Sequence, residues 1–473
     1  MRQYKRRQGG GLGLWVFVMV AVLALATAMS CGSDGAAELV RVAKVGGEAA
    51  RALDEAPLNV ERRRSSSTSY EMGVYAGVGQ FLAVLKIGTP LVSFTAIVDT
   101  GSDLVWRQCQ PCKQCYPQTD YGFPIFDPVR SSTFRKALCT DPLCQLYGSS
   151  CNSTTSSAAV TPAGGRACSY DSPYDDPPAF TRGQLAFDTL SLSDRSGRPH
   201  LFPHFAFGCS HESRGPYNFA GSGGIVGFGQ GNLSLPSQLH INRFSYCLRR
   251  TTLWSIDSSH HRSASSPAMA SSDTSSPLKK LCHASLAPSL ASPLLLGNDA
   301  HLGTGHDIQS TRILDRQSYY VELLAIRVAG RRLQIPRSVF RDGGTLIDSG
   351  TTFTTLPTVA FRPVYTAFRK LIPLTPWRGA AGGPRNLSLC YTSLPSPIPP
   401  LSFKFKGAHL RLSPYNYFIF IDNLYCLGIL ENQESGTVYG NVQQQDFHIL
   451  YDLHSQLISF KRTSCSALQY HGR

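Results

Sequence analysis

The stretch Ala96-Ile-Val-Asp99-Thr-Gly-Ser102 has a second copy in this 473-residue chain, Thr345-Leu-Ile-Asp348-Ser-Gly-Thr351. In each copy a short apolar run leads into a carboxylate, a hydroxyl, a glycine and a second hydroxyl. Either copy alone is compatible with an ordinary turn, because turns prefer Asp and Gly. Two copies in the two halves of the chain indicate an internal duplication.

The repeated tetrapeptide is suited to hold a carboxylate at the end of a strand. Its glycine permits a sharp turn and offers an amide, and its hydroxyls can hydrogen-bond the acid. Two such turns placed face to face bring two carboxylates so close that they share one proton. We therefore predict an acid and a base side by side. The residues of this candidate site are Asp99 and Asp348, supported by Thr100, Gly101, Ser102, Ser349, Gly350 and Thr351.

A weaker duplicated feature lies downstream of each acid. Ile225-Val-Gly227 occurs in the first half and Val438-Tyr-Gly440 in the second. An apolar pair that runs into glycine is common where buried strands end in turns, so this feature gains its value only from matching the first repeat.

The remaining pattern is mostly β. With 42% hydrophobic and 16% charged residues the chain can build a core, and its 42 Gly and 30 Pro favour short strands and turns. This composition excludes collagen, coiled coils and global disorder. Helical periodicity is confined to short pieces such as 359–371. Strand-like runs occur at 80–87, 94–98, 201–207, 319–328, 401–405, 417–421, 447–451 and 457–460.

The N-terminus indicates a secretory route. A basic patch and an apolar run that ends near Met29 predict a signal peptide at residues 1–30, with an uncleaved signal anchor as the alternative. Residues 31–68 contain the basic run at 62–64, which fits either a solvated linker or a propeptide; we predict a propeptide. No other segment is as apolar, so no stable membrane insertion is expected after signal removal. The formal net charge is +14.

A Ser-, Ala- and Pro-rich segment separates two lobes. We expect residues 251–292 to form a disordered insertion, because they offer few apolar side chains to a core. The scattered histidines in this segment keep no ligand spacing, so a metal site there is disfavoured. The expected lobes are 69–250, with a Cys-rich insertion, and 293–473.

With these motifs the sequence resembles the pepsin-type aspartic proteases, and more closely their plant nepenthesin-like branch. Further matching segments are Ile87–Pro90, Trp106, Gly224–Gly231 and Gly440–Gln445. The resemblance implies a bilobal, mostly β fold with Asp99 and Asp348 at the floor of a cleft. It also implies an aspartic-type endopeptidase that activates a water at acidic pH, without a cofactor or metal.

The cysteines support the branch assignment. Read alone, the spacing of Cys109, Cys112 and Cys115 fits a metal site, but in a secreted chain disulfides are the better interpretation. Cys31 falls near the leader and Cys282 in the Ser-rich insertion, where it is predicted to be a free or intermolecular thiol. The resemblance implies disulfides among the other twelve: Cys109, Cys112, Cys115, Cys139, Cys144, Cys151, Cys168, Cys209, Cys247, Cys390, Cys426 and Cys465.

The flap of the family departs from its usual pattern here. By position, Tyr174 matches the flap tyrosine and Trp106 its partner. Where relatives usually have Tyr-Gly-Asp-Gly-Ser, this chain has Tyr174-Asp-Asp-Pro-Pro-Ala179, and prolines stiffen a hairpin tip that must open and close. The alternative function is therefore a catalytically weak or inactive pepsin-like binding or inhibitor protein.

Further expectations concern modification and partners. Asn152, Asn232 and Asn386 begin glycosylation sequons. We expect a monomer that acts on protein or peptide substrates and is secreted, extracellular in the cell wall or apoplast, or vacuolar. No basic and aromatic cluster predicts nucleic-acid binding. Binding to an anionic wall polysaccharide is a third possible function, which the positive charge alone suggests and which is compatible with either of the other two.

Overall fold

The computed structural model describes residues 69–116, 118, 122–146, 151, 165–174, 179–215, 219, 221–251, 286, 288–378, 383–433 and 435–471. All of them belong to one structural unit. The expected signal peptide, the propeptide and residues 252–285 of the expected insertion lie outside the described residues. In the described part of the chain, no helix combines the length and apolar character needed to cross a bilayer.

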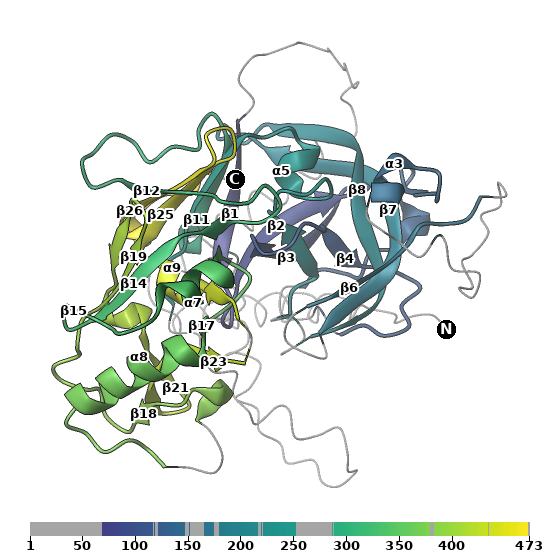
Figure 1. Cartoon of the computed structure of the whole chain (residues 1–473). Helices are drawn as coiled ribbons and strands as arrows, with labels where there is room; N and C mark the ends of the chain where they lie inside the picture. Colours follow the sequence, from purple (N-terminus) through teal and green to yellow (C-terminus); the bar gives the residue numbers. More distant parts are fainter. Residues whose placement is uncertain are drawn as a thin grey trace, which may run out of the picture. The chain divides into compact units, whose positions relative to one another are not determined.

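The predicted fold class is confirmed, because strands form most of the regular structure (Figure 1). A 14-stranded sheet runs through both halves of the chain. In spatial order its strands are β12 (Gln309–Arg312), β26 (Leu457–Arg462), β25 (Phe447–Asp452), β10 (Arg243–Cys247), β11 (Ser292–Gly297), β1 (Ser69–Ala76), β2 (Phe81–Ile87), β3 (Val92–Asp99), β9 (Gly224–Gly227), β4 (Trp106–Gln108), β8 (Pro199–Arg214), β7 (Phe180–Ser193) and β5 (Arg135–Lys136), with β6 (Ser169–Pro173) beside β7.

Three smaller sheets belong to the C-terminal half. They contain β13 (Tyr320–Val321), β16 (Thr345–Ile347), β24 (Thr437–Tyr439), β17 (Thr354–Pro357) and β23 (Ile429–Asn432); β15 (Arg331–Arg332), β14 (Leu323–Val328), β19 (Leu401–Phe405) and β20 (His409–Arg411); and β18 (Cys390–Tyr391), β22 (Leu424–Leu427) and β21 (Phe418–Ile421). The α-helices are α3 (Pro142–Leu146), α5 (Leu235–Gln238), α7 (Arg337–Asp342), α8 (Thr358–Leu371) and α9 (Asn441–Gln444).

Local sequence explains most of these elements. The last six residues of β3 are all buried, and four of them are apolar, as expected for a strand that is covered on both faces. α8 follows the predicted helical period and buries Ala360, Phe361, Val364 and Phe368 on one face. The run at 319–328 differs from the expectation of one strand: it divides into β13 and β14 at Glu322, whose carboxylate pairs with Lys406 at 3.0 Å.

The internal duplication is a duplication of topology. In the first half β3 is parallel to β9, while β4 is antiparallel to β9 and parallel to β8. In the second half β16 is parallel to β24, while β17 is antiparallel to β24 and parallel to β23. The weaker sequence repeat supplies β9 and β24. Both halves therefore place their acid at the same point of an equivalent four-strand arrangement.

Strands from both halves also join directly. β10 lies between β11 and β25, so that Tyr246 pairs with Ile449 across the junction. The rings of Phe244 and Tyr451 stack with centroids 4.5 Å apart, and Tyr319 packs edge-on against Tyr451. This buried aromatic cluster couples the packing of the two halves.

The described ends of the expected insertion are part of the fold. Thr251 is buried and donates its amide to Gln445, and Pro288–Leu290 forms a short 3-10 helix. Ser292 is buried as the first residue of β11. Pro288–Leu290 thus belongs to the described fold, five residues before the expected start of the C-terminal lobe at residue 293.

Six disulfides join the twelve framework cysteines. They pair Cys109 with Cys209, Cys112 with Cys115, Cys139 with Cys151, Cys144 with Cys168, Cys247 with Cys465, and Cys390 with Cys426. The part of the chain that the structure describes contains no free cysteine. Cys31 and Cys282 lie outside it.

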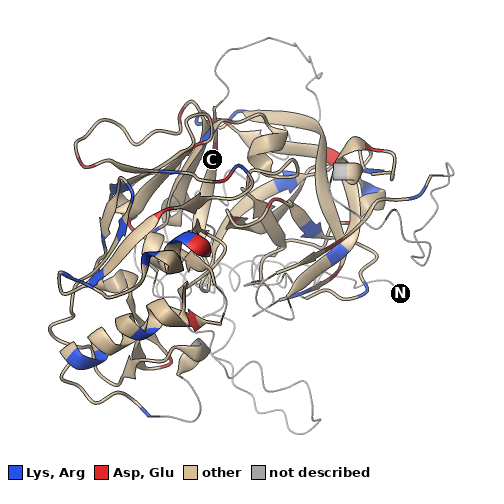
Figure 2. Cartoon of the chain, viewed as in Figure 1, with Lys and Arg blue, Asp and Glu red and all other residues tan. Residues whose placement is uncertain are grey.

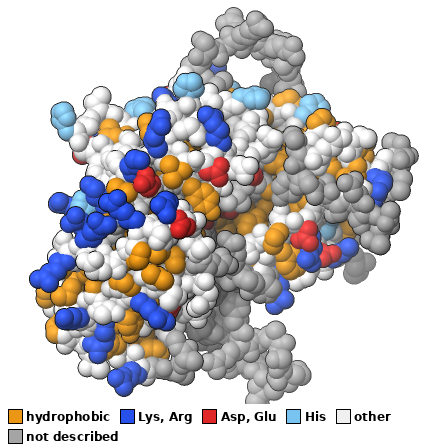
Figure 3. Space-filling view, in the orientation of Figure 1, with side chains coloured by type: hydrophobic (Ala, Val, Ile, Leu, Met, Phe, Trp, Pro, Cys, Tyr) orange, Lys and Arg blue, Asp and Glu red, His pale blue; other side chains and the backbone are white. Residues whose placement is uncertain are grey.

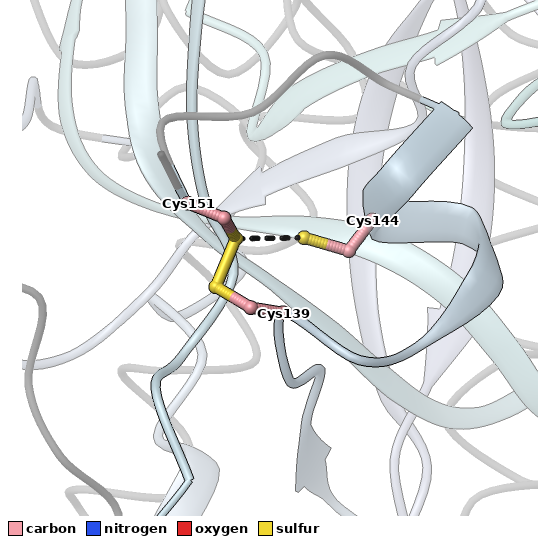
Figure 4. A group of neighbouring side chains, drawn as sticks. All are labelled: Cys139, Cys144 and Cys151. Carbon is pink, nitrogen blue, oxygen red and sulfur yellow. Dashed lines mark hydrogen bonds between the residues drawn. A yellow bond between two sulfur atoms is a disulfide. The ribbon is translucent and has the colours of Figure 1, made fainter. Parts of the chain in front are cut away.

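Two of these disulfides meet in the Cys-rich insertion. The sulfurs of Cys144 and Cys151 are 3.4 Å apart although each is bonded to another cysteine (Figure 4). The group of Cys139, Cys144 and Cys151 has the spacing of a metal site. Because every sulfur is in a disulfide, none is available as a thiolate ligand.

Loop length predicts very different contributions of two disulfides to stability. The Cys247–Cys465 bond closes a loop of 218 residues, whereas Cys112–Cys115 spans three. Replacing both cysteines by serine should lower the free energy of unfolding by about 5 kcal/mol for the long loop and by about 2 kcal/mol for the short one. Urea unfolding of the two double variants measures the difference. Equal losses would contradict the loop-entropy explanation.

Candidate active site

The two predicted acids lie at equivalent strand ends. Asp99 is the last residue of β3 and is opposite Gly227 of β9. Asp348 follows β16 directly, and its amide donates to the carbonyl of Tyr439 at 3.1 Å. Both are buried, with 6% and 7% of their surface exposed. The structure therefore brings the two acids to the junction between the two duplicated halves.

A reciprocal set of hydrogen bonds locks the two motifs together. The amide of Thr100 donates to Ser349 Oγ at 3.1 Å, and the amide of Ser349 donates to Thr100 Oγ1 at 2.9 Å. Each hydroxyl then donates to a carbonyl of the opposite strand, Thr100 to Ile347 at 3.2 Å and Ser349 to Val98 at 2.7 Å. All four bonds are buried, so neither motif can shift without breaking bonds made by the other.

Each carboxylate is held in the same way by its own turn. The amide of Gly101 donates to Asp99 Oδ1 at 2.8 Å, and the Ser102 hydroxyl donates to Oδ2. In the second motif the amide of Gly350 donates to Asp348 Oδ1 at 2.8 Å, and the Thr351 hydroxyl donates to Oδ2 at 2.5 Å. The eight predicted motif residues thus form one matched pair of carboxylate cradles.

Both motif glycines are required by the close approach of the opposite acid. A methyl group added to Gly101 would lie 2.8 Å from Cγ of Asp348, and one added to Gly350 would overlap the Asp99 carboxylate. Any side chain would therefore push the carboxylates apart. The glycines allow the two acids to face each other.

The proximity of the two acids changes their titration. Burial, followed by the charge of Asp348, raises the pKa of Asp99 well above its ordinary value. Hydrogen bonds from Ser102 and Gly101 favour the ionised form and offset this only in part. A proton is therefore retained on the pair at pH values where an isolated aspartate is ionised.

The two predicted flap residues are in contact. Trp106 Nε1 donates to the Tyr174 hydroxyl at 2.7 Å, and both rings pack edge-on against Phe219. Tyr174 follows β6, and its amide donates to Ala179 at the start of the returning strand. The unusual tip residues 175–178 lie outside the described residues.

Comparisons with known proteins agree with this geometry. Profiles described as xylanase inhibitor N-terminal and xylanase inhibitor C-terminal match residues 81–263 and 318–462. Aspartic proteinase nepenthesin-2 of Nepenthes gracilis is 35% identical over 85% of this chain and 82% of its own length. Nepenthesin-1 of the same plant is 33% identical over 86% and 83%. The chain belongs to the nepenthesin-like branch of the pepsin-type aspartic proteases.

A solved structure shares the fold of this branch. The crystal structure of basic 7S globulin from soybean has a TM-score of 0.61 and 19% identity, and the match covers 86% of this chain and 100% of the globulin. At this identity the likeness shows the fold alone. The sequence-based assignment to the family is confirmed, and the bilobal β fold with it.

Several residues beneath Asp99 and Asp348 were not predicted. Gln444 donates to the backbone carbonyl of Asp348 at 2.8 Å and accepts from the Tyr246 hydroxyl at 2.6 Å. The Tyr246 hydroxyl lies 2.9 Å from that of Tyr451, and all three side chains are buried. The signal in the sequence was the polar run that follows Gly440, because a short buried helix such as α9 does not usually contain two successive glutamines and a third as its C-cap.

A second unpredicted residue braces the loop after the first motif. Asp103 Oδ1 accepts a hydrogen bond from the amide of Gly231 at 2.8 Å, and this bond joins the loop after the first motif to the turn after β9. Burial raises the pKa of Asp103, and the hydrogen bond from Gly231 opposes the rise. Because Asp103 is near the dyad in sequence but bonded to backbone, its role is structural.

Two of the three glycosylation candidates lie at the surface of the described part of the chain. Asn232 and Asn386 are both exposed, at a turn before α5 and in a short 3-10 helix. Asn152 lies outside the described residues. Exposure leaves room for a glycan at the first two positions.

The reciprocal bonds between the motifs should carry a large share of local stability. Thr100→Val keeps the size of the side chain but leaves the buried amide of Ser349 and the carbonyl of Ile347 without their partner. It should lower the free energy of unfolding by about 2 to 4 kcal/mol. Thr100→Ser keeps the hydroxyl and should retain most of the wild-type stability. Denaturant unfolding of the two variants tests this, and a larger loss in Thr100→Ser than in Thr100→Val would show that the methyl group matters more than the hydroxyl.

The raised pKa of Asp99 predicts a pH-dependent cost of folding. Below the pKa of about 4 that Asp99 has in the unfolded chain, both states are protonated and its contribution to stability is fully present. That contribution is lost as pH rises through the higher pKa of Asp99 in the folded protein, because the unfolded chain gives up this proton more easily. Asp99→Asn should therefore raise the melting temperature, relative to wild type, more at pH 7 than at about pH 4. Asp171→Asn, on the exposed part of β6, is the control. An Asp99→Asn effect that does not vary with pH would contradict the raised pKa.

Proposed function

We propose that this chain is a secreted aspartic-type endopeptidase that hydrolyses peptide bonds at acidic pH with Asp99 and Asp348 as its catalytic pair. The proposal rests chiefly on one observation: the two carboxylates face each other across the motif glycines, and each is held by one amide and one hydroxyl. Such a pair carries one shared proton and so supplies an acid and a base at the same point.

The chemistry follows from that shared proton. The ionised carboxylate accepts a proton from a water held between the two acids, and the oxygen of that water attacks the scissile carbonyl carbon. The protonated carboxyl donates to the carbonyl oxygen as negative charge develops there. The tetrahedral intermediate collapses when an aspartic acid protonates the leaving nitrogen, and the C–N bond breaks without a covalent acyl-enzyme.

Hydrogen bonds from neighbouring residues keep the two acids fixed during this cycle. The reciprocal bonds between Thr100 and Ser349 hold the two strand ends, and Gln444 holds the backbone of Asp348. A small loss of alignment costs much of the rate, because both proton transfers need hydrogen-bond distance. The Trp106–Tyr174 bond would position the base of the flap over the substrate.

The secretory part of the proposal rests on the leader and on the disulfides. Six bonds among twelve cysteines are stable only in an oxidising compartment. The predicted signal peptide at 1–30 and the propeptide at 31–68 fit synthesis as a zymogen that matures outside the cytosol.

A non-catalytic binding protein is the second candidate. It is favoured by the proline-containing flap tip and by the inhibitor description of the two matching profiles. The complete set of motif hydroxyls and glycines around both acids favours the enzyme instead, because a binding role places no demand on them.

Activity of the acidified proform decides between the two. Wild type should cleave a denatured protein at acidic pH, and a statine-type inhibitor should stop it because its hydroxyl mimics the tetrahedral intermediate. Asp99→Asn and Asp348→Asn should each lower the cleavage rate by about a thousandfold or more, since each removes either the base or the acid. Asp171→Asn should retain full activity.

Correct folding has to be shown independently of activity. A cooperative thermal transition in each variant provides that control. If folded and processed wild type cleaves nothing between about pH 2 and pH 7, the chain is the binding protein. If Asp99→Asn cleaves as fast as wild type, the dyad is not the catalyst.

A further inference from the structure

One surface of the C-terminal half concentrates positive charge. The four-stranded sheet of β15, β14, β19 and β20 is built from residues 323–332 and 401–411. These two segments contain four Arg and two Lys but no Asp or Glu. Figure 2 marks Lys and Arg positions on the ribbon in the region of β14, β15 and β19, and the space-filling view in Figure 3 shows Lys and Arg side chains gathered over the same part of the surface.

The strand register aligns these charges on one face. Arg327 is opposite Arg332 on one side and Ser402 on the other, and Ser402 is opposite Arg411. These four residues thus lie side by side across all four strands. Lys404, two residues along β19, points to the same face beside His409. We call Arg332, Arg327, Arg411 and Lys404 the basic row.

The opposite face of the same sheet belongs to the core. Ile326, Phe403 and Leu410 alternate with members of the basic row and are buried. Arg332, Lys404 and Arg411 are exposed, and Arg327 is half-buried between them. The sheet is therefore fixed by its apolar side while its other side presents cations to solvent.

The charges of the basic row are not neutralised within the described part of the chain. No carboxylate described there forms an ion pair with any of the four. Lys406, which is next to the row, is paired with Glu322 at 3.0 Å. The pKa of His409 is lowered by burial and further by Arg411, Lys404 and Arg327, which is the mark of an uncompensated positive field.

The shape and chemistry of this face select its partner. Arg332 and Arg327 lie on adjacent strands, about 4.8 Å apart, and Arg411 lies two strands from Arg327, about 9.6 Å away, because Ser402 stands between them. This spacing suits an extended polyanion lying across the strands. Guanidinium groups bind carboxylates through paired hydrogen bonds. Between them Ala325 and Ser402 are buried and His409 is half-buried, and this face has no Phe, Tyr or Trp on which a nucleic-acid base could stack.

We propose that the basic row is a docking surface for a linear polyuronate, a polysaccharide that carries one carboxylate on each sugar. Arg332, Arg327 and Arg411 each bind a carboxylate, and Lys404 adds a fourth positive charge. Ser402, which is buried and whose hydroxyl lies 3.0 Å from His409 Nε2, separates Arg327 from Arg411 within the row. The surface holds the protein on an anionic matrix and takes no part in peptide hydrolysis.

Binding of a galacturonate oligomer to the full chain tests this inference. Arg332→Ser combined with Arg411→Ser should weaken binding about tenfold or more, because two charge-assisted contacts are lost. The matched control is Arg130→Ser combined with Arg198→Ser, which removes the same charge from two exposed arginines that already pair with aspartates. This control should change affinity less than about twofold.

Other arms of the experiment separate the partners. The methyl-esterified oligomer, which has the same backbone without charge, should not bind, and added salt should weaken binding of the acidic form. Equal losses in the row variant and the control would show that net charge alone is responsible and overturn the proposal. Tighter binding of a single-stranded DNA of equal charge would also overturn it. Melting temperatures equal to that of wild type show that each double variant is folded.

Discussion

Two carboxylates that cannot both be ionised have to be held in contact, and most of the fold of this protein serves that constraint. Asp99 and Asp348 repel each other when charged and are costly to bury. The reciprocal hydrogen bonds of Thr100 and Ser349 keep the two motifs from being pushed apart by this repulsion, because each motif supplies both a donor and an acceptor to the other. The duplicated strand topology is what delivers two identical turns to one place.

The same constraint explains the buried polar groups beneath the acids. Gln444, Tyr246 and Tyr451 form a connected set that ends on the carbonyl of Asp348. In an apolar interior each of these groups would be costly without a partner. Together they are satisfied and leave the backbone of the second motif little freedom. The strands that carry Tyr246 and Tyr451 pair directly, so the network is also part of the junction between the halves.

The sequence predicted the fold and the residues of the candidate site through repetition. Asp99 and Asp348 could be found because each is followed by the same three residue types, and the strands could be found because apolar runs end in turns. Tyr246 and Asp103 could not, because their roles depend on contacts across more than a hundred residues, and Gln444 left only the polar run after Gly440 as a signal. The division of 319–328 into two strands was missed for a related reason: Glu322, between the two strands, pairs with Lys406, which follows β19 about eighty residues later in the chain.

The distribution of charge gives the net value of +14 a physical meaning. Arginines of the N-terminal half such as Arg130, Arg182 and Arg198 have carboxylate partners, so they add little to the external field. The cations of the basic row share one face without such partners, and their repulsion has to be offset by the packing of Phe403 and Leu410 behind them. Net charge alone therefore says little about binding partners, whereas the strand register shows that the cations of the basic row share one face. The pair of Asp99 and Asp348 and the basic row treat like charges in opposite ways, because the buried acids avoid repulsion by sharing a proton, whereas the cations of the basic row stay charged at the surface.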